Sequence, residues 1–250
     1  MANQKGGVGK TTTAINLAAS LAAAEKRTLL VDCDSQGNAT SGMGIAGNSI
    51  REKNLYHSLI DRVPLREVII GTQIPHLDLV PANQDLVGIE VEFISLADRE
   101  KRLRNLLREL ETPYEYVIID CPPSLGFLTV NALVASDYLI VPLQCEYFAM
   151  EGLGHLLSTM GLIKARLNPT LALGGILLTM YDSRNLLSRR VSEDVRSHFR
   201  ERVFRTVIPR NVRLSESPSH GLPIILYDIK SRGAVSYMEL AKEIISDGRM

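Results

Sequence analysis

A glycine-rich segment at the start of the chain restricts the fold more than any other feature of the sequence. Residues 5–12 read KGGVGKTT and run into an Ala- and Leu-rich stretch, Thr11–Ala24, that predicts a helix. Glycines let the backbone curl around phosphate oxygens, and a helix N-terminus directs free N–H groups at an anion. The segment therefore predicts a nucleotide-phosphate loop; the alternative is a glycine-rich turn with two solvated lysines.

Two positions of this loop bear directly on chemistry. Lys10 can bridge the β- and γ-phosphates of a nucleotide, and the Thr11 hydroxyl can ligate Mg²⁺. The usual GxxxxGK[ST] pattern would place a glycine where the chain has Gln4, and the next position carries a second lysine, Lys5. The residues predicted to bind the phosphates are Lys5, Gly6, Gly7, Val8, Gly9, Lys10, Thr11 and Thr12.

Apolar runs of strand length alternate with helix-like segments along the rest of the chain. The expected strands are Thr28–Val31, Leu77–Val80, Tyr116–Ile119, Tyr138–Val141 and Leu171–Leu178. The expected helices are Asp98–Glu111, Met150–Leu167, Leu187–Phe199 and Val235–Ile245. Strands that are apolar on both faces suit a parallel sheet covered by helices on each side. The sequence thus predicts an α/β fold: a doubly wound, mostly parallel sheet with helices on both faces, in a single domain over residues 1–250.

Few residues precede the phosphate loop. Such a loop normally follows a strand, yet only Met1–Gln4 precede Lys5. Either the chain starts inside that first strand, so that the strand is truncated, or the assigned start is displaced, or the sheet folds with a stub. A missing central strand would leave backbone donors and apolar neighbours exposed, so we expect reduced stability.

The overall composition is that of an ordinary globular protein. The 250 residues are 45% hydrophobic, and 28 Lys+Arg balance 28 Asp+Glu, which argues against disorder and against a uniformly basic surface. The three cysteines, Cys33, Cys121 and Cys145, form no CxxC pair. This favours core packing over a metal cluster, and a reducing cytoplasm. No apolar run approaches the roughly 18 residues of a membrane helix.

Carboxylates follow two of the expected strands. Asp120 ends the strand Tyr116–Ile119, the position from which an acid holds Mg²⁺, often through water. Asp32 and Asp34 follow Val31, and they cannot point the same way while the backbone stays extended. Asp34 lies further into the loop and is the better candidate to position an attacking water. A cap or turn role is the alternative for this residue.

Five segments spread along the chain form a specific combination. They are KGGVGKTT at 5–12, DCDSQGNAT at 32–40, IIDCPPSLG at 118–126, QCEYFAMEGL at 144–153 and VIPRNVRLSESPSHG at 207–221. Together they resemble the ParA/Soj chromosome-partitioning ATPases, which belong to the deviant Walker-A class that also contains MinD. The resemblance spans Asn3 to about Ile245 and lacks only the usual first strand. It implies the fold of a P-loop NTPase and an ATP hydrolase that uses ATP and Mg²⁺.

The resemblance also implies a nucleotide-gated homodimer in which two subunits sandwich two ATP molecules. In such a dimer Lys5 reaches across to the partner's phosphates, where a cation supplied in trans stabilises charge that develops during transfer. Lys10 then contacts the phosphates, Asp34 the hydrolytic water, and Thr11 and Asp120 the metal. The implied catalytic residues are Lys5, Lys10 and Asp34.

Three further positions match functional positions of the family. Pro209 and Asn211 match residues that line the adenine pocket, and Glu146 matches a position at the dimer face or near the ribose. The implied partners are nonspecific double-stranded DNA and a ParB-type centromere-binding protein that stimulates hydrolysis. The implied location is the cytoplasm, in association with the nucleoid.

An arginine-rich segment fits the implied contact with DNA. Between Met180 and Leu214 there are nine arginines and four acidic residues, which leaves a charge of +5 in a chain of zero net charge. Such asymmetry indicates binding to a phosphate backbone, although a solvated helix face is the default for the part between Arg189 and Arg202. Arg184 and Arg213 match positions that bind nonspecific DNA in the family.

Two alternative functions remain open from the sequence: a MinD-like ATPase that acts at a membrane, and a nucleotide-gated switch that acts on replication initiation. The first requires a basic amphipathic helix at the C-terminus. The last segment, Val235–Met250, instead carries Glu239, Glu243 and Asp247 and lacks a cationic face. We therefore expect no membrane partner.

Overall fold

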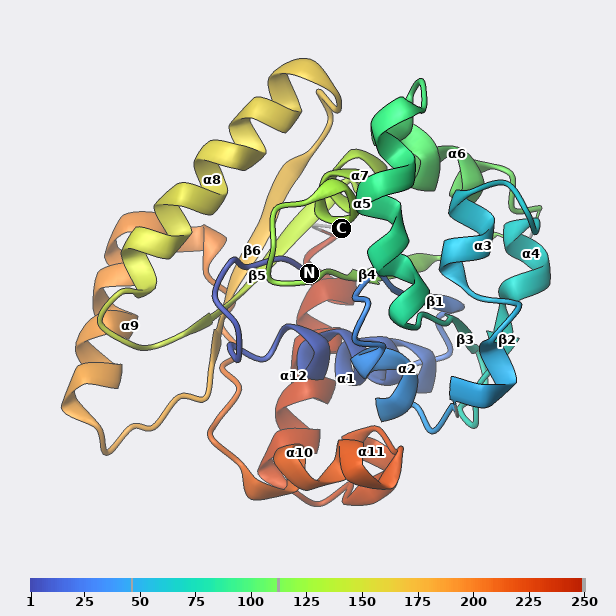
Figure 1. Ribbon diagram of the computed structural model, residues 1–250. Coiled ribbons are helices and arrows are strands. Elements are labelled where there is room, and N and C mark those ends of the chain that lie inside the picture. The colour runs from blue at the N-terminus through green and yellow to red at the C-terminus, as the bar shows by residue number, and fades with distance from the viewer. Residues whose placement is uncertain (46, 112, 249–250) are drawn as a thin grey trace.

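A divided, mostly parallel β-sheet forms the centre of the molecule (Figure 1). The computed structural model describes residues 1–45, 47–111 and 113–248. Four strands pair in the order β2-β3-β1-β4, and two more, β5 and β6, pair with each other. The strands are β1 (Thr28–Asp32), β2 (Ile70–Gly71), β3 (Leu77–Val80), β4 (Tyr116–Asp120), β5 (Tyr138–Gln144) and β6 (Ala172–Thr179). Within the described ranges only β2 runs antiparallel to its neighbour, which confirms the predicted mostly parallel sheet.

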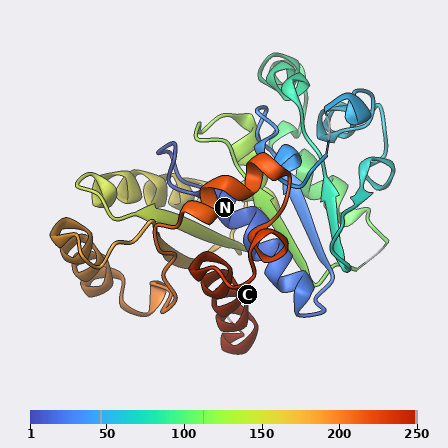
Figure 2. The same cartoon turned by 90° about the horizontal axis from the view of Figure 1, so that it is seen from below.

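Helices cover both faces of the sheet (Figure 2). On one face, α1 (Lys10–Ala23) and α12 (Arg232–Asp247) pack together against Leu30 of β1 and Ile118 of β4. On the other face, α7 (Phe127–Ala135) and α8 (Ala149–Arg166) belong to the same buried core as Val31 of β1, and α8 packs on β5. Successive strand residues therefore contribute to opposite cores, as the two-sided apolar runs require.

The remaining helices connect these layers. They are α2 (Asn38–Gly42), α3 (Leu55–Leu59), α4 (Leu65–Val68), α5 (Ile89–Glu92), α6 (Arg102–Arg108), α9 (Leu186–Phe199), α10 (Val212–Glu216) and α11 (Ile224–Tyr227). The stretch predicted as one helix over Asp98–Glu111 is shorter: a 3-10 turn at Arg99–Lys101 precedes α6. Asp98 has φ +52°, a left-handed conformation that breaks a regular helix at that point.

The N-terminal residues lie between β4 and β5, where the sheet is divided. The Met1 amino group donates to the Ile119 carbonyl at 2.6 Å, and the Ala2 N–H donates to a carbonyl of β5 at 3.3 Å. The Asn3 side chain donates through Nδ2 to the Pro142 carbonyl at 2.7 Å. Residues 1–3 do not form a regular strand. They lie where a central strand of the sheet would be, and they join its two parts.

A groove extends from Met1 along the same division. Its volume is about 620 Å³, and its walls include Val117 and Ile118 of β4 and Tyr138 and Ile140 of β5. The edges of these two strands therefore face each other across open space rather than across a paired strand.

The C-terminal helix is part of the core rather than a separate surface element. Tyr237 and Leu240 of α12 are buried, and the Tyr237 hydroxyl lies 3.1 Å from Oγ1 of Thr13 on α1. Burial alone would raise the pKa of Glu243, but the N–H groups of Arg205 and Thr206 donate to its carboxylate and the pKa is lowered instead.

Among the described helices, none has the length and apolar content to cross a membrane.

The Asn3 side chain offers a direct test of the tie between the two parts of the sheet. Asn3→Ala leaves the buried Pro142 carbonyl without its donor, so the free energy of unfolding should fall by about 1–3 kcal/mol. Urea denaturation of both proteins measures the difference. Asn48→Ala, at an exposed asparagine, serves as the control and should change little. Equal losses in the two variants would contradict the assigned role of Asn3.

Candidate active site

The glycine-rich loop lies at the carboxyl edge of the parallel strands, where open α/β sheets bind their ligands. Gly7 and Gly9 have φ of +74° and +85°, which other residues adopt only with strain. Gly9 immediately precedes α1, so the loop ends at a helix N-terminus. From the other part of the sheet, Thr179 at the end of β6 donates through Oγ1 to the Val8 carbonyl at 2.8 Å.

A cavity of about 560 Å³ opens above this loop. Asp34 from the loop after β1 and Pro122–Ser124 from the loop after β4 both line it. The predicted phosphate-loop residues that line it are Gly6, Gly7, Gly9, Lys10, Thr11 and Thr12. Val8 is instead buried beneath the loop, and Lys5 does not line the cavity.

Lys10 lies almost fully inside the protein. Its side chain curls back so that Nζ donates to the Lys5 carbonyl at 3.0 Å, which closes the loop into a ring. Burial lowers the pKa of Lys10, and the nearby charge of Asp120 opposes that shift. A buried ammonium group at the floor of the cavity is suited to a polyanion.

Asp32 and Asp120 are paired in register at the ends of β1 and β4, and both are fully buried. Asp32 accepts three hydrogen bonds, from the Thr40 N–H and hydroxyl at 2.8 and 2.7 Å and from the Asp34 N–H at 3.1 Å. Its pKa is raised to about 6, chiefly by burial. Thr40 also accepts from the Ala82 N–H at 2.9 Å, so Asp32 fixes the loops after β1 and β3.

Asp120 differs sharply from its neighbour. Within the described part of the chain, neither of its carboxylate oxygens has a well-formed hydrogen bond. Burial, followed by the charge of Asp32, raises the pKa of Asp120 to about 7, and the neighbouring Thr11 hydroxyl offsets only part of that shift. A buried carboxylate with so little compensation, beside the Thr11 hydroxyl, offers the oxygen ligands that a hard divalent cation prefers. These residues fit Mg²⁺.

Asp34 makes a turn contact and also lines the cavity. Its Oδ1 accepts from the Gln36 N–H at 3.0 Å, which is a turn contact. The residue is only 7% exposed. The turn therefore holds the Asp34 carboxylate at the cavity wall.

A second cavity of about 250 Å³ adjoins the first through Gly9 and Thr12. Pro209 and Asn211, the residues predicted for the adenine pocket, both line it. Asn211 uses its Oδ1 to cap α10, where it accepts from the Leu214 N–H at 3.2 Å, and this fixes the orientation of its amide.

Lys5 does not line the phosphate cavity and instead forms an ion pair with Glu146 in the loop after β5. Both side chains are 44% exposed. Because the two residues are 141 positions apart in the sequence, only the fold brings them together. The family resemblance suggested Glu146 for the dimer face or the ribose, but the sequence could not reveal its ion pair with Lys5.

The two arginines predicted to bind DNA are exposed, and each forms an ion pair with a nearby carboxylate. Arg184 pairs with Asp182 at 3.1 Å, and Arg213 pairs with Glu216 at 3.0 Å and more loosely with Asp228. On α9 the segment also exposes Arg189 and Arg190. Its further arginines are Arg196, Arg200, Arg202, Arg205 and Arg210.

The sequence and fold were compared with known proteins. A family profile described as "AAA domain" matches residues 1–173. The chain is 56% identical to the chromosome partitioning protein ParA of Myxococcus xanthus, over 98% of this chain and 86% of that one. It is 53% identical to the sporulation initiation inhibitor protein Soj of Bacillus subtilis, over 98% and 97% of the two chains. The chain belongs to the ParA/Soj family of partitioning ATPases. The predicted family and the predicted ATP hydrolase are thereby confirmed.

A solved structure with a different name shares the fold. Cobyrinic acid a,c-diamide synthase from Mycobacterium smegmatis, with bound ADP and magnesium, is 38% identical and superimposes with a TM-score of 0.86, over 99% of this chain and 93% of that one. The P-loop NTPase fold predicted for this ParA/Soj chain is confirmed, and ATP and Mg²⁺ as its cofactors agree with the known proteins. The three cysteines, also predicted to be core residues, are buried as free thiols.

The buried carboxylate pair makes stability depend on pH. With the pKa of Asp120 raised to about 7, the folded protein keeps a proton that the unfolded chain loses near pH 4 (~3.9 for a free Asp). The free energy of unfolding of the protein without Mg²⁺ should therefore fall as the pH rises from about 4 to 7. Asp120→Asn should flatten this dependence and reduce the stabilisation gained from Mg²⁺ and ATP.

Urea unfolding at pH 5 and pH 7, with and without Mg²⁺ and ATP, measures both effects. Asp137→Asn, at an exposed carboxylate, is the matched control and should follow the wild type. Parallel pH profiles for wild type and Asp120→Asn would show that this carboxylate is not the source of the effect.

Proposed function

We propose that this partitioning ATPase works as an ATP-gated DNA-binding switch. ATP favours a homodimer, the dimer binds double-stranded DNA without sequence preference, and hydrolysis releases it. Linkage requires that ATP and DNA both bind the dimer more tightly than the monomer. A ParB-type protein at centromere-like sites stimulates hydrolysis and so sets where release occurs. In the cell such a protein is cytoplasmic and nucleoid-associated.

The observation that carries this proposal is the cavity at the carboxyl edge of the sheet. It combines a helix N-terminus, the buried ammonium group of Lys10 and the poorly compensated carboxylate of Asp120 within one open site. Phosphate oxygens satisfy the first two, and a divalent cation satisfies the third. The adjoining cavity at Pro209 and Asn211 has room for the base.

The proposed chemistry assigns one task to each group. Lys10 and the loop N–H groups hold the β- and γ-phosphates, while Thr11 and Asp120 hold Mg²⁺, Asp120 directly or through water. When bound, Mg²⁺ neutralises charge on the phosphate oxygens. Asp34 orients the attacking water from the wall of the cavity. Glycine at positions 6, 7 and 9 keeps the backbone close enough for these contacts.

Lys5 completes the site only in a dimer. Its side chain is outside its own phosphate cavity and pairs with Glu146 at the protein surface. An exposed ion pair of this kind contributes only about 0–1 kcal/mol, so a partner's phosphates can compete for the lysine. This supports the proposed action of Lys5 in trans.

DNA binding is assigned to the arginine-rich segment. Asp182 holds the guanidinium of Arg184 in a fixed orientation beside α9, whose surface exposes Arg189 and Arg190. Arg213 follows Asn211 of the adenine pocket by two residues, so the base and the proposed DNA contact share one short segment. That proximity supports a link between nucleotide state and DNA affinity.

The first experiment measures retention of the protein on random-sequence DNA with ATP, ADP or no nucleotide. Wild type should bind only with ATP, and Asp34→Ala should stay bound because it binds ATP but stalls before hydrolysis. Arg184→Glu should weaken binding at least tenfold and flatten its salt dependence, whose log–log slope is roughly −0.9 per neutralised phosphate. Arg66→Glu, on the exposed face of α4, is the control for charge alone. If no protein binds DNA in any state, the arginine segment is a solvated face and the regulatory or membrane alternative is favoured.

The trans role of Lys5 is tested separately. Lys5→Ala should retain ATP affinity within a few-fold but lose ATP-dependent dimerisation, because its own phosphates do not need it. Sedimentation with ATP measures the dimer, and a fluorescent nucleotide measures the affinity. Lys26→Ala removes a lysine from another Lys–Glu pair and should behave as wild type. Unchanged dimerisation of Lys5→Ala would remove this residue from the proposed mechanism.

A further inference from the structure

A buried hydroxyl holds the far end of the loop after β4. Thr129, the third residue of α7, is 1% exposed and donates through Oγ1 to the Ser124 carbonyl at 2.6 Å. Ser124 and the two prolines before it line the phosphate cavity. At its other end the loop follows Asp120, whose position is set by the pairing of β4 with β1. The Thr129 hydroxyl therefore fixes the end of this cavity wall that the sheet does not hold.

The helix α7 begins without the side-chain cap that commonly anchors a helix end. Gly126 stands at the cap position and offers no side-chain acceptor. Instead, Oε1 of Glu90 on α5 accepts from the Phe127 N–H at 3.1 Å. This hydrogen bond lies at the protein surface, where water competes for both groups, so the helix end depends on further contacts.

Asn131, one turn further along α7, supplies such contacts from the interior. It is 1% exposed, and all the hydrogen-bonding groups of its amide are used. Nδ2 donates to the carbonyls of Phe127 and Arg99 at 3.0 and 2.8 Å, while Oδ1 accepts from the Leu103 N–H at 3.1 Å. The amide thus ties the start of α7 to the backbone at the start of α6.

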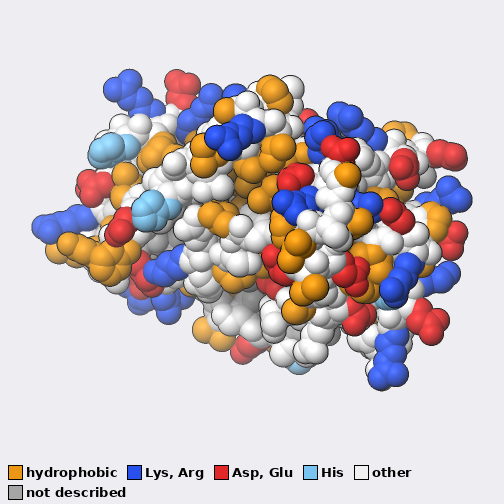
Figure 3. Space-filling view, turned by 45° about the horizontal axis from the view of Figure 1, so that its top comes forward, with side chains coloured by type: hydrophobic (Ala, Val, Ile, Leu, Met, Phe, Trp, Pro, Cys, Tyr) orange, Lys and Arg blue, Asp and Glu red, His pale blue; other side chains and the backbone are white. Residues whose placement is uncertain are grey.

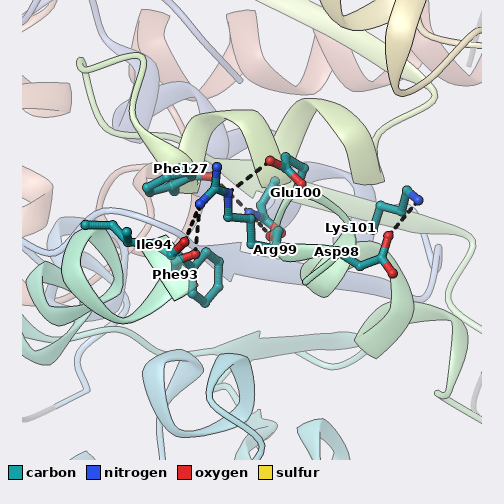
Figure 4. Close-up of polar contacts among 8 residues, drawn as sticks. Phe93, Ile94, Asp98, Arg99, Glu100, Lys101 and Phe127 are labelled. Carbon is teal, nitrogen blue, oxygen red and sulfur yellow. Dashed lines mark hydrogen bonds and ion pairs between the residues drawn. The ribbon is translucent and has the colours of Figure 1, made fainter. Parts of the chain in front are cut away.

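The Arg99 side chain contacts the same helix end (Figure 4). Its guanidinium lies 4.9 Å from the centre of the Phe127 ring, a distance at which a cation is attracted to an aromatic face. The same group donates to the carbonyls of Phe93 and Ile94 at 3.3 and 2.7 Å and pairs with Glu100 at 3.1 Å. Arg99 is therefore fixed in place and restrains Phe127, the residue with which α7 begins.

The surface over α6 and α7 is of an ordinary kind. In Figure 3, where the upper side of Figure 1 is turned forward, Lys and Arg side chains are mingled with Asp and Glu side chains. Such a mixture is typical of a solvated face. The contacts of Thr129 and Asn131 are instead buried, and they lead to the loop that lines the phosphate cavity. Their role therefore lies within the protein.

We propose that Thr129 is a positioning residue for ATP hydrolysis, and that Asn131 and Arg99 hold the helix turn from which it acts. Pro122 and Pro123 lack the N–H that would bind a phosphate, so the wall they form shapes the cavity rather than binding the nucleotide. A misplacement of about 1 Å near reacting groups costs on the order of 100-fold in rate. The proposal rests on this cavity being the site of hydrolysis, as proposed above.

Steady-state ATP hydrolysis by Thr129→Val tests the hydroxyl, because valine keeps the shape of the side chain. We expect kcat to fall by about tenfold or more and KM for ATP to stay within about threefold, because the phosphate-binding groups lie on the glycine-rich loop. Thr129→Ser keeps the hydroxyl and should restore most of kcat. The matched control is Thr28→Val, at a fully buried threonine at the amino end of β1, where the same change removes a hydrogen bond to the Lys26 carbonyl. Its kcat should equal that of wild type, and urea denaturation compares the stability of all variants.

Arg99→Lys tests the outer part of the cluster, because lysine cannot reproduce the planar group over Phe127. It should lower kcat by about threefold, and the double variant with Thr129→Val should be no slower than Thr129→Val alone, because both residues act through one loop. Losses that multiply would remove Arg99 from the proposal.

Four results would overturn the role of Thr129: unchanged kcat in Thr129→Val, a raised KM with unchanged kcat, no recovery in Thr129→Ser, or an equal loss of kcat in Thr28→Val. Asp34→Ala separates these failures from a failure of the site itself. If Asp34→Ala hydrolyses ATP as fast as wild type, the cavity is not the site of hydrolysis and both proposals fall. If Asp34→Ala is inactive while Thr129→Val is unimpaired, only the positioning role is lost.

Discussion

The burial of two carboxylates at the ends of β1 and β4 is the interaction on which the active site depends. Strand pairing places Asp32 and Asp120 side by side in an environment that disfavours their charge. Asp32 is compensated by three donors, and those hydrogen bonds shape the loop that carries Asp34. Asp120 has no well-formed hydrogen bond in the described protein, and the Thr11 hydroxyl offsets only part of the cost of its burial. A divalent cation at the proposed metal site would supply the missing compensation.

Much of this architecture could be predicted from the sequence. The strands at Leu77–Val80 and Tyr116–Ile119 agree with the structure to within one residue, because each is a mostly apolar run of strand length, although Asp78 and the exposed Val117 interrupt the pattern. The helix α7 was not predicted, because FLTVNALVA is mostly apolar and is buried on most sides, so it carries no clear helical periodicity. The two-residue strand β2 is too short to leave a pattern. Predictions therefore succeeded where burial leaves a periodic signal, and failed where it does not.

Some features of the site could be predicted from local sequence, and others depend on long-range contacts. Those within the glycine-rich loop follow from local chemistry, and the structure brings them into one cavity with Asp34. The contacts that set their behaviour are long-range: Lys5 with Glu146, Thr179 with the Val8 carbonyl, and Glu90 with Phe127. Each joins segments that lie far apart in the chain, so a single sequence cannot reveal the pairing. The ion pair between Arg184 and Asp182 is local but was hidden by the net charge of the segment.

The division of the sheet gives a bound nucleotide a mechanical role. The carboxylates and the phosphate cavity belong to the β1–β4 side, whereas Thr179 and the cavity at Pro209 continue from β6 on the other side. Besides helix packing, residues 1–3 tie the two strand groups together through backbone and side-chain hydrogen bonds. A nucleotide bound as proposed would occupy both cavities and span this division, so nucleotide binding would also change how firmly the two parts of the sheet are held together.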